Sequence, residues 1–193
     1  LEPYKNLEKL IKDKNYFIIS TNADGQLEKS DFDKNKIFSM QGNYGYLQCM
    51  TPCTDEIYES EEYIKKMTKS IENNRVSMDT VPRCPHCGNY LIPNLRCDDT
   101  FVEKPHMKNS EKYRDFLREN INKNILFLEL GVGYNTPVII RYPFEKMTYN
   151  LDKSTLARVN KGMATVSKEI EDKSISLDED INKVLLDVIK NMN

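Results

Sequence analysis

The pattern of apolar and polar positions predicts helices that alternate with short buried strands. Apolar residues recur at helical spacing in four segments, residues 3–14, 57–75, 110–123 and 178–192. Continuous apolar runs typical of buried strands end the segment 31–40 and fill residues 16–20, 125–131 and 155–160. Pro137 is expected to open a short helix over 137–145. Strands alternating with helices favour an α/β fold with a parallel sheet.

The helix predicted over 110–123 has the most specific internal pattern. Ser110 is expected to be its N-cap, and its buried stripe is expected to consist of Tyr113, Phe116, Leu117 and Ile121. The helix over 57–75 is expected to separate two cysteine pairs.

Between about residues 46 and 99 the alternation breaks, and the chain becomes irregular, rich in proline and cysteine-bearing. This stretch is interpreted as a small module inserted into the sheet domain. The expected division is 1–45 for part of the sheet domain, 46–104 for the module with its helix, and 105–193 for the rest of the sheet domain.

Composition narrows the class of protein. The 193 residues are 39% hydrophobic and 30% charged, with a formal net charge of −2, which is typical of a soluble globular protein. Neither a long apolar run nor a basic-then-apolar leader is seen, so we expect a cytoplasmic protein without a membrane anchor. Residues 46–62 are acidic, which disfavours a nucleic-acid-binding zinc ribbon.

The five cysteines indicate a metal site. Cys49 and Cys53 form one close pair, and Cys84 and Cys87 form another in the sequence CPHCG. Two such pairs supply the tetrahedral thiolate set that structural Zn²⁺ prefers, and four thiolates leave no open position for catalysis. His86 is the alternative ligand in the second pair, and a solvated histidine is the simpler interpretation. Cys97 is expected to be a spare thiol.

Several segments together resemble the sirtuin family. Residues 20–25 (STNADG) resemble the family's Thr-Gln-Asn-Ile-Asp-Gly loop, and residues 37–42 (IFSMQG) resemble the segment that ends in its catalytic His-Gly. The two cysteine pairs follow where the family has its zinc module. Residues 131–133 (GVG) stand where the family has Gly-Thr-Ser, and 157–160 (ARVN) match a strand that ends in an adenosine-binding Asn.

The departures from the family pattern resemble the class M sirtuins, which are encoded beside macrodomain proteins. The catalytic His is replaced by Gln41, and the motif Gln by Thr21. The Phe-Gly-Glu that follows the module in lysine deacylases is missing, and residues 128–145 (LELGVGYNTPVIIRYPFE) give a long specific match. The resemblance implies a Rossmann-like, NAD-dependent protein mono-ADP-ribosyltransferase.

The resemblance also implies site residues. The catalytic candidates are Asn22, Asp24, Gln41 and Arg96. The candidates for binding NAD⁺ as co-substrate are Thr21, Asn22, Asp24, Gln41, Gly131, Val132, Gly133, Asn135, Asn160 and Lys161. Asp24 would hold the nicotinamide carboxamide, Asn22 would position the ribose, and Arg96 would steer an anionic acceptor.

The implied acceptor is a lipoylated carrier protein of the glycine-cleavage H type, and macrodomain and lipoate-ligase proteins are the implied partners. The family's Gly-Ala-Gly-x-Ser loop for the NAD pyrophosphate is not found. We expect it upstream of Leu1, and we expect the isolated chain to hold zinc but to be inactive.

Glutamine changes the chemistry that this site can perform. An amide donates and accepts hydrogen bonds but cannot take a proton at neutral pH, so Gln41 removes the general base of deacylation. Cleavage of the NAD glycosidic bond needs no strong base. Two enzyme alternatives remain, an NAD glycohydrolase and a deacylase that uses another base such as His106. A non-catalytic module that binds NAD or a partner is the third.

Overall fold

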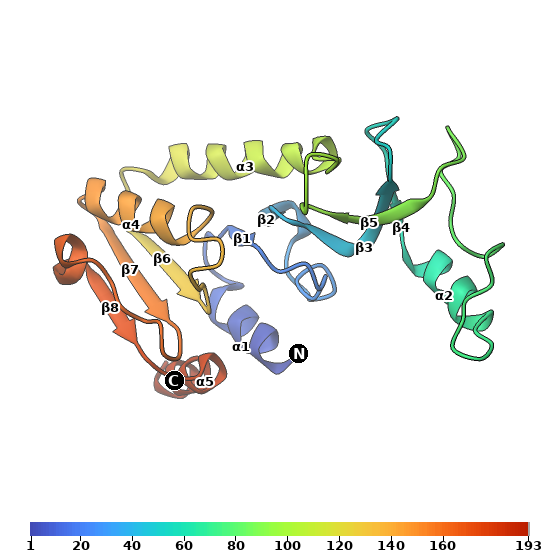
Figure 1. Ribbon diagram of the computed structural model, residues 1–193. Coiled ribbons are helices and arrows are strands. Elements are labelled where there is room, and N and C mark those ends of the chain that lie inside the picture. Colours follow the sequence, from blue (N-terminus) through green and yellow to red (C-terminus); the bar gives the residue numbers. More distant parts are fainter. Residues whose placement is uncertain (193) are drawn as a thin grey trace. The chain divides into compact units, whose positions relative to one another are not determined.

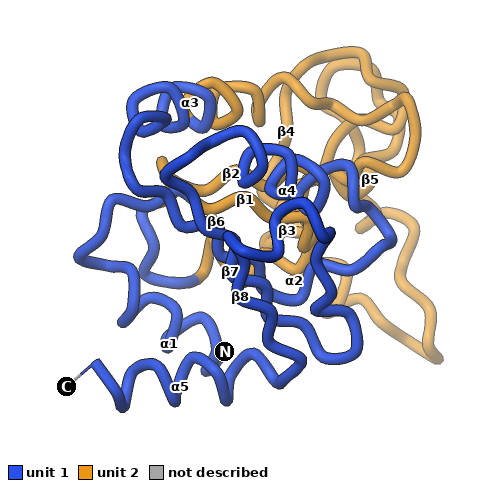
Figure 2. Tube along the Cα trace, turned by 90° about the vertical axis from the view of Figure 1, so that its left-hand side faces the viewer, with its two compact units in different colours: residues 1–17, 30–33, 113–193 blue, residues 18–29, 34–112 orange. Residues whose placement is uncertain are grey.

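The computed structural model describes residues 1–192, which divide into two compact units (Figure 2). Unit 1 consists of residues 1–17, 30–33 and the described chain from 113 onward. Unit 2 consists of residues 18–29 and 34–112. Each unit contains parallel strands, so the predicted α/β class with parallel pairing is confirmed.

Unit 1 is built on a three-stranded parallel sheet in the order β6-β7-β8 (Figure 1). Its strands are β6 (Ile125–Leu130), β7 (Ser154–Val159) and β8 (Ser174–Leu177). The crossovers are α4 (Arg141–Asn150) and the 3-10 helix η2 (Lys168–Lys173). Phe127 of β6 packs on Phe144 of α4 with ring centroids 5.0 Å apart, and Leu156 of β7 is fully buried. This helix-on-sheet contact forms the apolar core of the unit.

Two terminal helices of unit 1 pack together, α1 (Glu2–Ile11) and α5 (Ile181–Asn191). The buried Asn6 donates a hydrogen bond to Oδ1 of Asn182 at 2.8 Å. Asp180 caps α5 by accepting a hydrogen bond from the backbone N–H of Lys183. Both predicted terminal helices are therefore confirmed, with slightly shorter bounds.

Unit 2 contains two small sheets. The parallel strands β1 (Ile18–Ser20) and β2 (Ile37–Ser39) form the first, with the 3-10 helix η1 (Lys34–Lys36) directly before β2. The second is antiparallel in the order β4-β3-β5, with β3 (Gly42–Cys49), β4 (Ile57–Glu59) and β5 (Leu91–Leu95). Helix α2 (Glu61–Lys69) follows β4, and α3 (Lys104–Asn120) runs from unit 2 into unit 1.

The helix predicted over 57–75 is wrong at both ends. Ile57 lies in β4, where it pairs with Gln48 of β3, and the helix begins only at Glu61. Ile71 lies beyond the helix end and is exposed. Antiparallel pairing with the preceding strand β3 overrides the local helical spacing of apolar residues.

Two other predicted helix starts are also wrong. Helix α3 begins at Lys104, so Ser110 lies inside it rather than at its N-cap, and Ile121 falls past its end and is exposed. Pro105 occupies the first turn, where its missing N–H removes no helical hydrogen bond. Helix α4 begins at Arg141, four positions after Pro137, because the intervening residues form a turn.

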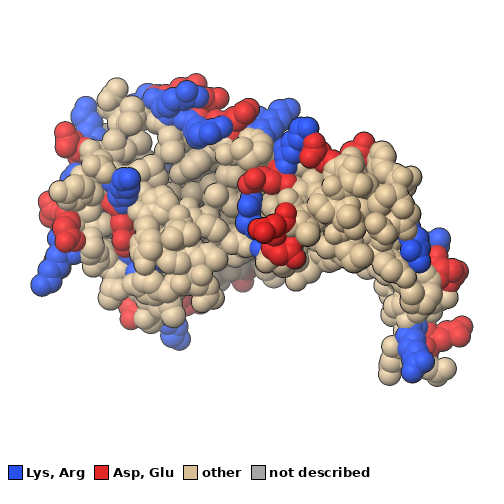
Figure 3. Space-filling view, turned by 45° about the horizontal axis from the view of Figure 1, so that its top comes forward, with Lys and Arg blue, Asp and Glu red and all other residues tan. Residues whose placement is uncertain are grey.

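Charged side chains of both signs are interspersed on the face shown in Figure 3, in keeping with the small net charge. Within residues 1–192, none of the helices combines the length and the hydropathy that a membrane span requires.

Candidate functional site

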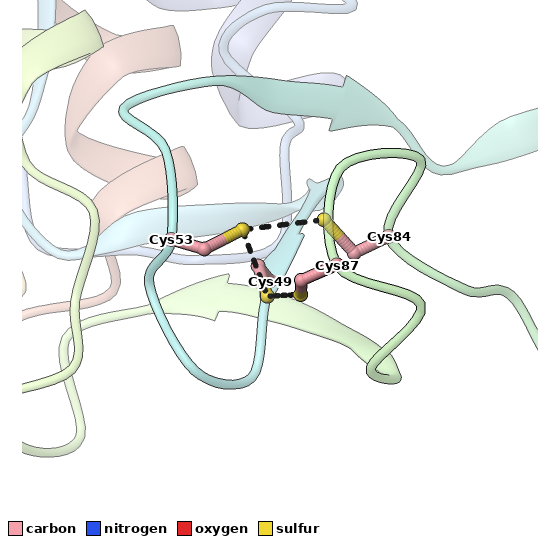
Figure 4. A group of neighbouring side chains, drawn as sticks. All are labelled: Cys49, Cys53, Cys84 and Cys87. Atoms are coloured by element: carbon pink, nitrogen blue, oxygen red, sulfur yellow. Dashed lines mark hydrogen bonds between the residues drawn. The ribbon is translucent and has the colours of Figure 1, made fainter.

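Four cysteines of unit 2 converge on one point (Figure 4). The Sγ atoms of Cys49, Cys53, Cys84 and Cys87 all lie within 4.8 Å of one another. The Cys49–Cys87, Cys53–Cys84 and Cys49–Cys53 sulfur pairs are 3.5, 3.6 and 3.7 Å apart. A tetrahedron of thiolates about 2.3 Å from a zinc ion has sulfurs about 3.8 Å apart. The predicted ligand set can therefore hold one metal ion.

The electrostatics of the four thiols favour a bound cation. Burial is the largest influence on the pKa of Cys84 and raises it, but hydrogen bonds from the backbone of Cys87 and His86 outweigh it and lower the pKa to about 6. The hydrogen bond with Cys87, followed by burial, raises the pKa of Cys53 to about 12. One thiolate therefore forms readily and discourages its neighbours from ionising, and a metal ion relieves that repulsion.

Local backbone geometry builds the second cysteine pair. Gly88 has φ of +75°, and its N–H donates to the carbonyl of Cys84 at 2.9 Å. A positive φ suits glycine because it has no Cβ. His86 turns away from the cluster, and its Nε2 lies 2.9 Å from the carboxylate of Glu56. Cys97 is exposed and lies outside the cluster.

Strands β3 and β5 connect the cysteine cluster to the candidate catalytic residues. Cys49 ends β3 and pairs with Leu91 at the start of β5, while Gly42 at the other end of β3 pairs with Leu95. Gln41 precedes β3 directly, and Arg96 follows β5 directly. The antiparallel register therefore brings Gln41 and Arg96 together at the end of the strand pair that is remote from the cysteines.

Hydrogen bonds fix the meeting of these two residues. The backbone N–H of Arg96 donates to the carbonyl of Gln41 at 3.0 Å, and Nε of Arg96 donates to the carbonyl of Met40 at 3.2 Å. The guanidinium also pairs with the Glu103 carboxylate, and its carbon lies 4.5 Å from the centre of the Phe101 ring. Arg96 nevertheless remains exposed.

The loop after β1 adjoins the same turn. Strands β1 and β2 are paired and parallel, so the loops that carry Thr21, Asn22 and Asp24 and the turn at Gln41 start at neighbouring carboxyl ends. The N–H of Met40 donates to the carbonyl of Ser20 at 3.0 Å. Ligands bind at such carboxyl ends in open α/β sheets.

Two hydrogen bonds fix the conformation of that loop. The N–H of Tyr44 donates to the carbonyl of Ala23 at 2.9 Å, and Oδ1 of Asp24 accepts from the N–H of Gln26 at 3.0 Å. Thr21 and Gln41 are half-buried, while Asn22 and Asp24 are exposed. Unit 2 therefore gathers the four catalytic candidates around loops that meet at strand ends.

The remaining nucleotide-binding candidates lie in unit 1, also at strand ends. Gly131 follows β6 with φ of +68°, and its N–H donates to the carbonyl of Val159 at 2.9 Å. Asn160 follows β7, and its Nδ2 donates to the carbonyl of Val132 at 2.9 Å. The loop with Gly133 and the loop with Asn160 are thus joined directly. Asn135 and Lys161 are exposed in those two loops.

A buried ionic network supports these loops and was not among the predicted site residues. Arg158 of β7 donates to both carboxylate oxygens of its register partner Glu129, at 2.6 and 2.9 Å, and to Glu145 at 2.8 Å. Glu129 and Arg158 are fully buried. The sequence signal was one acidic residue within the apolar run of β6 and one basic residue among the apolar residues at the end of β7.

Arg141 extends the network into both loops. Its guanidinium donates to three backbone carbonyls, those of Val132, Met163 and Thr165, at 3.3, 3.2 and 2.7 Å. It also donates to the Tyr134 hydroxyl at 2.9 Å and lies over that ring. The cost of burying this arginine is offset by these bonds and by Glu129, 3.7 Å away. The two loops are therefore held in one fixed arrangement.

The chain is similar to known ADP-ribosyltransferases along most of its length. It is 29% identical over 192 residues to a protein ADP-ribosyltransferase of Staphylococcus aureus, covering 98% of this chain and 61% of that protein. It is 32% identical over 170 residues to a probable bifunctional ADP-ribose hydrolase/ADP-ribosyltransferase of Fusarium oxysporum, covering 83% of this chain and 28% of that protein. No protein-family model matches. The chain thus spans less than two thirds of the length of either relative.

Proposed function

We propose that this chain is part of a sirtuin-type, NAD-dependent protein mono-ADP-ribosyltransferase. The observation that carries the proposal is the turn at Gln41, where a glutamine stands beside Arg96 and next to the loop of Asn22 and Asp24. The similarity to ADP-ribosyltransferases supports the same activity.

The residues at this turn match the demands of glycosidic transfer. In the proposed reaction the bond between nicotinamide and ribose C1′ breaks with its electron pair leaving on nicotinamide, and an acceptor nucleophile bonds to C1′ and releases its proton to solvent. Asn22, Asp24 and Gln41 offer amide and carboxylate groups that orient the ribose and the carboxamide. The proposed reaction does not require any of them to act as the base that deacylation needs.

The acceptor we propose is a lipoylated carrier protein of the glycine-cleavage H type, and the metal we propose is one structural zinc ion. Four cysteine sulfurs at tetrahedral spacing fit Zn²⁺ and leave no open coordination position. The exposed guanidinium of Arg96 suits an acidic acceptor surface, which would take the place of Glu103.

The test uses the full-length gene product, labelled NAD⁺, a lipoylated carrier protein and an acetyl-lysine peptide. We expect the mass of one ADP-ribose to be added to the carrier while the peptide keeps its acetyl group. Gln41→Ala should lower the transfer rate by about 100-fold because the reacting groups lose their alignment. The exposed Lys108→Gln serves as the matched control.

Loss of the acetyl group would contradict the proposal, since another residue would then supply the base. Binding of NAD⁺ without any turnover would favour a non-catalytic module instead.

A further inference from the structure

Strands β3 and β5, which lead to the turn at Gln41 and to Arg96, carry a buried pair of amides. Gln48 is 1% exposed and Asn94 is fully buried. Oε1 of Gln48 accepts from the backbone N–H of Val102 at 2.9 Å, and its Nε2 donates to the carbonyl of Thr100 at 2.7 Å. Because a backbone N–H only donates and a carbonyl only accepts, these two bonds fix the orientation of the Gln48 amide.

The orientation of the Gln48 amide fixes that of the Asn94 amide, which in turn identifies the protonated nitrogen of His106. Nδ2 of Asn94 donates to Oε1 of Gln48 at 2.7 Å and to the carbonyl of Val102 at 3.2 Å. The Oδ1 atom of Asn94 is therefore the acceptor in its 2.7 Å contact with Nε2 of His106. His106 must carry a proton on Nε2, so Nε2 cannot serve as the base that a deacylase would need.

Phe101 connects the imidazole to Arg96 and to the turn at Gln41. Its ring stacks on His106 with centroids 5.5 Å apart and an interplanar angle of 16°, and it contacts the Arg96 guanidinium. A Cβ built on Gly42 would lie 2.9 Å from Cε2 of Phe101, so the ring also borders the turn at Gln41. The backbone carbonyl of Asn94 borders Gly42 even more closely, at 2.1 Å from the same point.

We propose that His106 is a positioning residue for ADP-ribosyl transfer, which as the Nε2–H tautomer holds Asn94 and Phe101 and through them Arg96 and the Gln41–Gly42 turn. This role rests on the proposed function, because it has meaning only if Gln41 and Arg96 act on the substrate. His106 itself touches no reacting atom.

The kinetic test compares His106→Gln, His106→Leu and the control Lys108→Gln in the full-length protein. His106→Leu removes the donor and should lower kcat by about 10- to 100-fold through misplacement of the turn. His106→Gln keeps an amide N–H that reaches Asn94, so its kcat should be at least about fivefold higher than that of His106→Leu. Metal content should stay within about twofold of wild type, because the cysteine cluster lies apart from His106 and its contacts.

A spectroscopic test keeps the inference falsifiable even if His106→Leu fails to fold. This chain contributes two histidines, so ¹⁵N spectra of labelled full-length protein at pH 8, in which His86→Gln and His106→Gln variants identify the two signals, report the tautomer of His106 directly. The Nε2–H tautomer is expected. The Nδ1–H tautomer, wild-type kcat in His106→Leu, or equal losses in both His106 variants would each overturn the positioning role alone. Absence of transfer by wild-type protein would instead overturn the proposed function, and the positioning role with it.

Discussion

The turn at Gln41 and Gly42 shows how a few atoms set what this site can do. Gln41 keeps hydrogen-bonding groups at the position where the resembling family has a histidine, and it offers no base. Gly42 has φ of +72°, and a Cβ there would fall 2.1 Å from the carbonyl oxygen of Asn94. The glycine therefore lets β3 approach β5 closely just before Arg96.

Replacement of Gly42 should be costlier than its backbone angle alone implies. Gly88→Ala meets no atom within 4 Å and carries only the strain of its positive φ, about 1–2 kcal/mol. Gly42→Ala adds a clash with backbone and should lower the free energy of unfolding by at least about 1 kcal/mol more. Urea denaturation of both zinc-loaded variants measures the difference, and equal losses would show that β3 and β5 separate without penalty.

The pKa values of His86 and His106 should be shifted in opposite directions from the usual histidine value. The hydrogen bond and charge of Glu56 raise the pKa of His86, whereas burial first and then the charge of Arg96 lower the pKa of His106, against smaller opposite effects of Glu103 and Glu28. The stability contributed by His86 is therefore present below about pH 6.5 and lost as pH rises through its folded pKa. The contribution of His106 is present above about pH 6.5 and lost as pH falls.

An NMR titration of labelled histidines measures both values. His106→Gln should flatten the decline of unfolding free energy below about pH 6.5, and Lys108→Gln should leave the decline unchanged. A pKa for His106 in the folded protein that is equal to or above that of His86 would contradict this prediction.

Strands β3 and β5 form one element with the cysteine cluster at one end and the candidates Gln41 and Arg96 at the other. Their register runs from Cys49 and Leu91 to Gly42 and Leu95, with an irregularity between Gly42 and Leu47. A metal ion that fixes Cys49 therefore fixes the strand that delivers Gln41. Structural zinc contributes directly to folding energy in small modules.

Replacement of a cysteine inside the cluster should affect zinc binding, whereas replacement of the cysteine outside it should not. Cys84→Ser should abolish stoichiometric zinc binding and disorder the turn at Gln41, while Cys97→Ser should retain one zinc ion per chain. Metal analysis by mass spectrometry and the backbone NMR signals of Gln41 and Gly42 provide the measurements. Retention of zinc in Cys84→Ser would mean that another group completes the site.

Both units place candidate residues at the ends of strands, and each supports them with buried polar groups. In unit 1 the support is ionic, with Glu129, Arg141 and Arg158 almost completely buried. In unit 2 the support is the amide pair of Gln48 and Asn94. Polar networks of this kind favour one arrangement of the loops above them, because any other arrangement leaves a buried group without a partner.

Removal of one member of the ionic network should be severe. Arg158→Met leaves Glu129 buried with a single, more distant arginine, and should cost about 3–5 kcal/mol of unfolding free energy. The double variant Arg158→Met with Glu129→Leu removes both charges and should be more stable than the single variant. Thermal unfolding of the two proteins provides the comparison, and a double variant less stable than Arg158→Met would contradict the argument.

The sequence by itself determined the features that depend on local chemistry. Apolar periodicity located α1 and α5, and continuous apolar runs located β1, β6 and β7, because both patterns arise from burial within a short segment. The spacing of the cysteine pairs identified all four members of the cluster, because each pair closes a short turn around one ligand position.

Only the tertiary structure decided which distant residues meet. The short strands β4, β5 and β8 exist through pairing with other strands, which the apolar pattern within each segment does not encode. The contacts of Arg96 with Gln41 and Phe101, of His106 with Asn94, and of Arg141 with two loops arise for the same reason. A buried polar group needs a partner, but its sequence neighbours do not specify which residue the fold will supply.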